Sequence, residues 1–365
     1  MASAAPAAKK PKLAGNGAAP APADAHPPRA PPPTIDATGW KGADVLRVSQ
    51  LSPACIADLF AVADTCKALV ASKGGTDCAR GRVLANAFFE PSTRTSCSFY
   101  AAMLRLGGTV VPLAKATSSA KKGETLADSA RTLCCYADVL VLRHPRVGSC
   151  FEAADAVTKP VLNAGDGPGE HPTQALLDLY TIMDELRACG LGDPEAWRAR
   201  GVTVTMVGDL KYGRTVHSLA RLLARYAGVS LHFVSPASLA LPAYVHADVV
   251  AAGNTPTHHT TGDAGGEGID AALLAQTDIL YVTRVQKERF PTPEAYEAVR
   301  GAFRFAPADL AAMKPGARML HPLPRVGEID PACDADPRAA YWRQVENGMY
   351  VRMALLAKVM GVEPK

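Results

Sequence analysis

A short polar segment at residues 90–95, Glu-Pro-Ser-Thr-Arg-Thr, holds the densest group of side chains that could bind an anion. It follows an apolar run at 82–89 and precedes a helical pattern at 97–106, so a strand is expected to lead there into a helix. The first turn of a helix has unpaired backbone N–H groups and the positive end of the helix dipole. The segment adds three hydroxyls and one guanidinium, from Ser92, Thr93, Arg94 and Thr95. An isolated Ser-Thr pair would only cap the helix, but the embedded arginine favours a phosphate site.

Three further polar groups follow apolar runs. Arg143 comes directly after the run at 137–142, and its guanidinium could reach both phosphate and carbonyl oxygens. His171 and Gln174 follow a glycine-rich turn at the start of a helical pattern, where a neutral imidazole could donate to a carbonyl oxygen. The loop 321–325, which contains Pro322 and Leu323, could accept hydrogen bonds from a substrate amide or amine through its backbone. Taken singly, an arginine after a strand is more often a surface residue, and a histidine at a helix start is more often a cap.

Two arginines in the second half indicate a second ligand. Arg214 begins a helical pattern, and Arg284 follows the apolar run 279–282. Gln286 lies two residues after Arg284 and therefore on the same side of an extended chain. Because a guanidinium can grip a carboxylate with two hydrogen bonds, the pair predicts a dicarboxylic amino acid as ligand.

The composition is that of a globular protein long enough for two domains. The 365 residues include 48% hydrophobic and 20% charged residues, with a net charge of +4 and dispersed basic residues, which argues against nucleic acid as a partner. No run of about 18 apolar residues occurs, so no membrane span is expected. The nine cysteines form no CxxC pair and no metal-ligand spacing with histidine, which fits a reducing, cytoplasmic location and predicts no metal.

Strand-like runs alternate with helical patterns, which predicts an α/β protein with two domains, each a parallel sheet flanked by helices. The expected division is a disordered Ala/Pro-rich leader at 1–37, a first domain at 38–185, a second at 186–338 and a C-terminal helix at 339–365. A plastid address for the leader is the alternative to a cytoplasmic location. Residues 251–268 are rich in Gly, Thr and His and are expected to form a flexible surface insertion. His258 and His259 within it could bind a metal, but two histidines without a third ligand more often belong to a polar loop.

Residues 90–95 resemble the carbamoyl-phosphate signature of the transcarbamoylases, and residues 171–174 are similar to their His-Pro-x-Gln motif. The resemblance covers 40–360. It points to the aspartate branch, because the chain lacks the Ser-Met-Gly stretch of the ornithine branch and has Pro322 where that branch has cysteine. Residues 334–341 and 346–350 look most like the animal multifunctional and plant types. It implies the transcarbamoylase fold and the synthesis of N-carbamoyl-L-aspartate from carbamoyl phosphate and L-aspartate, early in pyrimidine formation, without a cofactor.

The resemblance also implies roles for particular residues. Catalysis would depend on Arg94, Thr95, Arg143, His171 and Lys122. Carbamoyl phosphate would contact Ser92, Thr93, Arg94, Thr95, Ser118, Lys122, Arg143, His171, Gln174, Pro322 and Leu323, and aspartate would contact Lys122, Arg214, Arg284 and Gln286. In this family the residues at positions 118 and 122 reach into a neighbouring subunit, which implies a homotrimer, and a uridine nucleotide is a candidate inhibitor.

Two other interpretations stay open. The stretch 207–214 suggests a dinucleotide site, but it lacks a third glycine at the required place and an acidic residue about 20 positions later. A catalytically silent homologue, acting as a scaffold, a regulatory subunit or one domain of a larger assembly, is the alternative to an enzyme. The complete set of site residues argues against the silent form.

Overall fold

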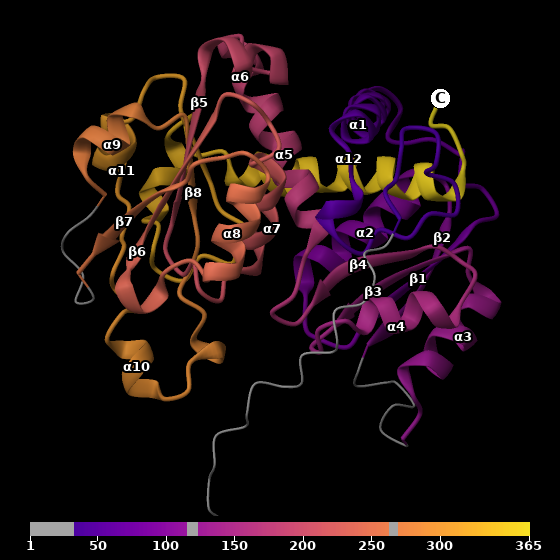
Figure 1. Ribbon diagram of the computed structural model, residues 1–365. Helices are drawn as coiled ribbons and strands as arrows, with labels where there is room; N and C mark the ends of the chain where they lie inside the picture. The colour runs from indigo at the N-terminus through magenta and orange to yellow at the C-terminus, as the bar shows by residue number, and fades with distance from the viewer. Residues whose placement is uncertain (1–32, 115–122, 263–268) are drawn as a thin grey trace, which may run out of the picture. The chain divides into compact units, whose positions relative to one another are not determined.

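Two parallel β-sheets form the framework of the computed structural model (Figure 1). The structure describes residues 33–114, 123–262 and 269–365, and Pro31–Lys365 form one compact unit. Helices connect the successive parallel strands, as parallel pairing requires. The predicted α/β class, with two parallel sheets flanked by helices, is confirmed.

The first sheet has the strand order β2-β1-β3-β4. Its strands are β1 (Val83–Phe88), β2 (Thr109–Ala114), β3 (Val139–His144) and β4 (Val161–Asp166). The chain moves from β1 to one side and then returns to build the other side, so the loops after β1 and β3 leave in opposite directions. Such a reversal opens a crevice at the carboxyl ends of the strands.

The second sheet repeats this arrangement, with the order β7-β6-β5-β8-β9. Its strands are β5 (Val202–Val207), β6 (Val229–Pro236), β7 (Thr257–Thr261), β8 (Ile279–Val282) and β9 (Arg318–Leu320). Here the reversal lies between β5 and β8. The segments that begin at Gly208 and Thr283 therefore leave the sheet on either side of a second crevice.

Capping residues mark the ends of the longest helix, whereas α2 begins at Thr93, four residues before the expected pattern at 97–106. The longest, α1 (Pro53–Lys73), has Ser52 as its N-cap, with proline at the first helical position and Gly74 in the left-handed conformation at its end. The others are α2 (Thr93–Arg105), α3 (Leu126–Tyr136), α4 (Ser149–Ala156), α5 (Pro172–Leu186), α6 (Pro194–Arg200), α7 (Arg214–Leu223), α8 (Ala243–Ala251), α9 (Ala271–Gln276), α10 (Pro293–Glu297), α11 (Pro307–Ala312) and α12 (Tyr341–Met360). Within the described ranges, none of these helices is both long and apolar enough to cross a membrane.

Helix α12 returns from the second sheet to the helices of the first, and Figure 1 shows it in yellow beside α5 and α1. Lys358 forms an ion pair with Asp58 of α1 at 2.6 Å. Arg352 donates to the Ser98 hydroxyl of α2 at 2.9 Å. The first contact joins α12 to α1, and the second joins it to α2, whose first turn carries the predicted phosphate site.

The structure corrects the prediction for residues 251–268 in its described part. Residues 257–261 form β7, an edge strand parallel to β6, so the prediction of an irregular insertion is wrong there. The strand was missed because its side chains are polar on both faces of the sheet, so no alternation of apolar and polar residues marks it. His258 stacks on Phe233 with ring centroids 5.4 Å apart, and His259 lies 3.0 Å from a ring nitrogen of His232. Residues 263–268 lie outside the described part of the chain.

The predicted leader also needs a correction at its end. Ile35 is 4% exposed, its N–H donates to the Gln50 carbonyl at 2.7 Å, and it forms a β-bridge with Leu51. Packing therefore begins before residue 38, because an isoleucine two residues after a proline run supplies apolar area to the core. Residues 1–32 lie outside the described ranges.

Candidate active site

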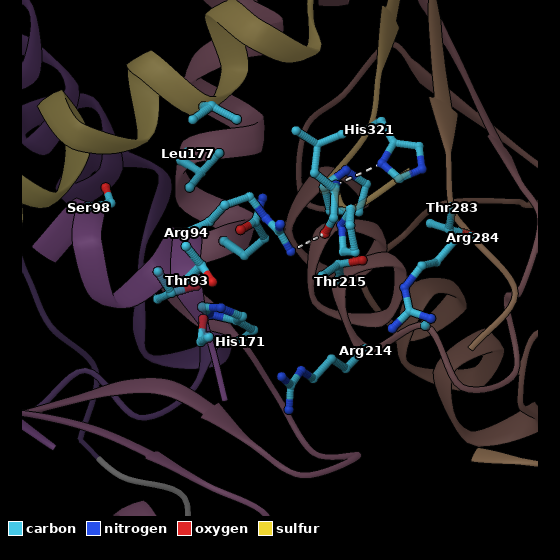
Figure 2. A pocket seen from close by; sticks show the side chains of 18 of the residues that line it. Thr93, Arg94, Ser98, His171, Leu177, Arg214, Thr215, Thr283, Arg284 and His321 are labelled. Carbon is cyan, nitrogen blue, oxygen red and sulfur yellow. Dashed lines mark hydrogen bonds between the residues drawn. The ribbon is translucent and has the colours of Figure 1, made fainter. Parts of the chain in front are cut away.

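A pocket of about 560 Å³ is lined by the polar segments that follow the strands of both sheets. Every predicted site residue that the structure describes lines it: Ser92, Thr93, Arg94, Thr95, Arg143, His171, Gln174, Arg214, Arg284, Gln286, Pro322 and Leu323. The two remaining predicted residues, Ser118 and Lys122, fall within 115–122, outside the described residues. Figure 2 shows Thr93, Arg94 and His171 on one side of the pocket and Thr283 and Arg284 on the other.

The first wall is the start of α2. Ser92 occupies the N-cap position, but its side chain makes no capping hydrogen bond, so the hydroxyl is not committed to the helix. The unpaired N–H groups of the first turn face the same pocket as the Thr93 and Thr95 side chains. Partial burial and the nearby Arg284 guanidinium lower the pKa of Arg94, which stays cationic at physiological pH. This turn therefore combines backbone donors, hydroxyls and a fixed cation, which suits a phosphate dianion.

Arg143 lies at the end of β3, beside the first turn of α2. Its side chain is only 13% exposed, and its Nε lies 3.2 Å from a carboxylate oxygen of Glu90. Burial, followed by repulsion from Arg214, lowers the pKa of Arg143 to about 10, while Glu90 favours its charged form. Arg143 thus remains a cation held in a fixed orientation.

His171 is the N-cap residue of α5 and is 3% exposed. Its backbone N–H donates to the Ser218 hydroxyl at 3.2 Å, which ties the start of α5 to α7. Burial, together with the cations Arg214, Arg143 and Arg352, places the pKa of His171 well below the ordinary histidine range. The imidazole is therefore neutral at physiological pH and can donate one N–H to a carbonyl oxygen, whereas it is a poor base.

The lowered pKa of His171 predicts a pH dependence of stability. The unfolded chain takes up a proton on this ring below about pH 6.5, and the folded protein does not. Folding should therefore become less favourable as the pH falls, by about 1.4 kcal/mol per pH unit for this one group between pH 6 and 5. Urea unfolding of the wild type and His171→Gln at several pH values measures this slope, which should be smaller in the variant. Equal slopes would show that His171 titrates normally.

Arg214 enters the pocket from the start of α7. Its side chain is 11% exposed and lies 3.6 Å from the Glu90 carboxylate, and it donates to the Gly167 carbonyl. Gly165, with φ +118°, allows this approach, because a Cβ there would stand 3.1 Å from the guanidinium carbon of Arg214. Burial lowers the pKa of Arg214, and Glu90 opposes that effect. The glycine-rich turn predicted for His171 therefore also makes room for the arginine of the second sheet.

Arg284 and Gln286 follow β8 on the opposite side of the pocket. The Gln286 N–H donates to Asp209 at 3.2 Å, and the same carboxylate accepts from the Tyr212 N–H at 2.9 Å. Asp209 is fully buried, and its two hydrogen bonds join the loop after β5 to the loop after β8. The predicted pair of arginines, Arg214 and Arg284, is brought into one pocket by these two loops.

The loop after β9 contributes backbone atoms. Leu323 has φ +55°, a conformation that non-glycine residues rarely adopt, and its N–H donates to the His321 ring at 2.7 Å. Its carbonyl accepts from Arg94 Nη2 at 2.8 Å, a contact drawn as a dashed line in Figure 2. His321 is in turn held by Glu328 at 2.7 Å. The loop is therefore held in a constrained geometry, with Pro322 and Leu323 lining the pocket.

Sequence reasoning assigned no role to several residues that line this pocket. Glu90 lies within 4 Å of three guanidiniums, those of Arg143, Arg214 and Arg289. Arg352 is 3% exposed, and burial lowers its pKa to about 10. The sequence signal for Arg352 was a charged residue inside the apolar stretch of the last helix. No local pattern pointed to Glu90, because its partners are distant in the sequence.

The pocket is strongly cationic. Among the described residues that line it, six are arginines and one, Glu90, is acidic. Guanidiniums gathered in a partly buried space repel one another unless anions occupy it. A ligand with several negative charges is therefore favoured. The described residues contain no group of three or more His, Cys, Asp and Glu side chains that could hold a metal ion.

The fold and this site define a two-sheet α/β protein with a pocket for an anionic ligand, and comparison with known families identifies its family. Residues 43–184 match the carbamoyl-phosphate-binding domain of aspartate/ornithine carbamoyltransferases, and residues 200–359 match their aspartate/ornithine-binding domain. The chain belongs to the aspartate/ornithine carbamoyltransferase family.

Individual relatives cover most of the chain. The multifunctional protein CAD of Squalus acanthias is 47% identical over 88% of this chain, and the aspartate carbamoyltransferase catalytic subunit of Thermococcus onnurineus is 45% identical over 88% of this chain and 98% of its own length. A crystal structure of Trypanosoma cruzi aspartate transcarbamoylase with carbamoyl phosphate and aspartate is 38% identical, covers 89% of this chain and 99% of that chain, and has a TM-score of 0.79. The chain spans only 13–17% of the length of the multifunctional relatives.

Proposed function

We propose that this chain transfers the carbamoyl group of carbamoyl phosphate to L-aspartate, giving N-carbamoyl-L-aspartate and phosphate in pyrimidine biosynthesis. The observation that carries the proposal is the distribution of the six arginines around one pocket. Arg94 and Arg143 lie with the backbone donors of α2, as a phosphate requires. Arg214 and Arg284 come from the second sheet and suit the two carboxylates of aspartate. Ornithine would instead bring a cationic side chain among these guanidiniums.

The chemical step needs an electrophilic carbonyl and a neutral amine. The aspartate amine nitrogen attacks the carbonyl carbon, the bond from that carbon to the phosphate oxygen breaks, and phosphate leaves with the electron pair. Thr95, Arg143 and the neutral His171 stabilise the negative charge that develops on the carbonyl oxygen. Among the described pocket residues, Glu90 is held by arginines and the His171 pKa is low, so the departing phosphate is the preferred acceptor of the amine proton.

The purified chain should form carbamoyl-aspartate when it is given both substrates. Ornithine offered as a competing acceptor should yield little carbamoyl-ornithine. Formation of neither product would support a catalytically silent homologue. Preference for ornithine would contradict the assignment of Arg214 and Arg284.

Three parts of the proposal come from the family resemblance alone. The enzyme acts as a homotrimer in which Ser118 and Lys122 serve the site of a neighbouring subunit. A uridine nucleotide is a candidate inhibitor, which competition with carbamoyl phosphate would detect. The location is cytoplasmic, with a plastid as the alternative.

The shared site can be tested by mixing two inactive variants. Lys122→Ala and Arg94→Ala chains should each have little activity. A mixed trimer contains sites built from an intact Arg94 on one chain and an intact Lys122 on another, so unfolding and refolding the two together should recover part of the activity. No recovery in trimers shown to be mixed would contradict the shared site.

A further inference from the structure

A buried carboxylate, Asp178, lies behind the pocket and contacts three of its surrounding elements. It is 0% exposed and lies on α5, one turn after Gln174. Its Oδ1 accepts from Gln174 Nε2 at 2.8 Å and from Gln344 Nε2 at 2.6 Å, and its Oδ2 accepts from the Tyr281 hydroxyl at 2.8 Å. The three donors come from α5, α12 and β8. Asp178 therefore links the helices behind the first sheet to a strand of the second.

The contacts of Asp178 determine how two side-chain amides are oriented. A carboxylate only accepts hydrogen bonds, so an amide turned towards it must present its NH2 group. Gln344 gives an independent check, since its Oε1 accepts from the His321 N–H at 2.9 Å while its NH2 donates to Asp178. The reversed amide would place a donor against the His321 N–H. Both ends of Gln344 thus agree with a single orientation.

The same reasoning applies to Gln174, which lines the pocket. One N–H of its NH2 group donates to Asp178 behind the pocket, which draws that end of the amide away from a ligand and leaves the carbonyl oxygen as the end that can face it. The neighbouring loop adds the Leu323 carbonyl, which accepts from Arg94, and that loop is tied to Asp178 through His321 and Gln344. This part of the pocket wall therefore presents acceptors. An acceptor wall suits a ligand group that carries N–H donors.

We propose that Asp178 is a positioning residue that holds the Gln174 carbonyl oxygen towards the pocket and thereby selects a carbamoyl group over an acyl group of the same shape. This inference rests on the proposed function and deepens it. A carbamoyl group carries an NH2 where an acetyl group carries a methyl. Acetyl phosphate would leave the Gln174 oxygen without a donor, which disfavours its binding.

The protonation state of Asp178 does not alter this role. Burial raises its pKa to about 6, opposed by the hydrogen bonds from Gln344, Tyr281 and Gln174. A proton on Oδ2 would lie beside the Tyr281 oxygen, which can accept it, and Oδ1 would still accept from both amides. Asparagine imitates that protonated form, with its oxygen at the Oδ1 position. Leucine has nearly the same shape but offers no acceptor.

The experiment compares the binding of carbamoyl phosphate, acetyl phosphate and inorganic phosphate by calorimetry. The wild type should prefer carbamoyl phosphate to acetyl phosphate. In Asp178→Leu this preference should fall by about 10- to 100-fold, the effect of one or two lost hydrogen bonds, with phosphate affinity nearly unchanged. Asp178→Asn should keep the preference. Asp184→Leu, on the same helix but bonded to Lys67 and Asn347, is the matched control and should also keep it.

Several results would overturn the inference. These are a wild type without the preference, an Asp178→Leu protein that keeps it, or one that loses affinity for all three anions equally, as a purely structural role predicts. If Asp178→Leu does not fold, Gln174→Met decides, because this variant removes the residue through which Asp178 acts. A Gln174→Met protein that keeps the preference would overturn the inference. These readouts are binding constants. A wild type that keeps the preference but makes no carbamoyl-aspartate would contradict the proposed function and still support this role for Asp178.

Discussion

Replacing Arg94 by alanine is expected to lower kcat/KM for carbamoyl phosphate by about 100- to 1000-fold, the effect of removing one fixed donor from a charge-stabilising site. Arg94 lies in the first turn of α2, in the pocket, and is oriented by the Leu323 carbonyl at 2.8 Å. Its loss would remove the cation that the first turn of α2 itself carries. It would also release the Leu323 carbonyl, which Arg94 holds in the wild type.

Steady-state kinetics with carbamoyl phosphate as the varied substrate would measure this effect. Arg105→Ala is a suitable control, because Arg105 is in the last turn of the same helix and lies away from the pocket. The thermal midpoint should change little in Arg94→Ala, since the side chain is not part of the core. Near-normal turnover in a folded Arg94→Ala protein would contradict the assignment of the phosphate site.

Replacing Arg284 by alanine should act on the second substrate instead. The KM for aspartate is expected to rise by about 100-fold, because a charged two-point hydrogen bond to a carboxylate contributes on the order of 3 kcal/mol. Figure 2 shows Arg284 across the pocket from Arg94, and repulsion from Arg284 contributes to the lowered pKa of Arg94. Removing Arg284 should therefore leave carbamoyl phosphate affinity within about 3-fold of the wild type, since surface and long-range charge effects are small.

The comparison needs separate titrations of aspartate and carbamoyl phosphate. Arg300→Ala removes an exposed arginine that forms an ion pair with Glu297 at 2.9 Å, and it should change neither constant. A loss of carbamoyl phosphate affinity as large as the loss for aspartate would contradict the assignment of Arg284 to the second substrate alone.

The regular elements could be predicted wherever burial left a periodic pattern. The apolar runs that became β1, β3, β5 and β8 are buried on both faces, as strands in the middle of parallel sheets must be. Strand β7 could not be found in this way, because it lies at a sheet edge and its Thr and His side chains are largely exposed. Its position follows from backbone pairing with β6 and from stacking of His258 on Phe233.

The site could be predicted where chemistry is local in the sequence. Residues 90–95 and 171–174 carry their hydroxyls, cation and imidazole within a few positions, beside a helix start. Glu90, Arg289 and Asp178 were missed because their partners are far away along the chain. The Glu90 carboxylate approaches Arg143, Arg214 and Arg289, and Asp178 joins Gln174, Tyr281 and Gln344.

The sequence by itself determined the class of fold, and it predicted a turn suited to phosphate and a pair of arginines suited to a dicarboxylate, because periodicity and helix starts are local properties. Only the tertiary structure decided how those parts meet. Strand order reverses once in each sheet, and the loops on both sides of the reversals converge on one pocket. Burial in that pocket then lowers the pKa of His171 and Arg143, and a carboxylate behind it sets which end of Gln174 faces the ligand. Such effects depend on distances between residues remote in the chain, which no local pattern contains.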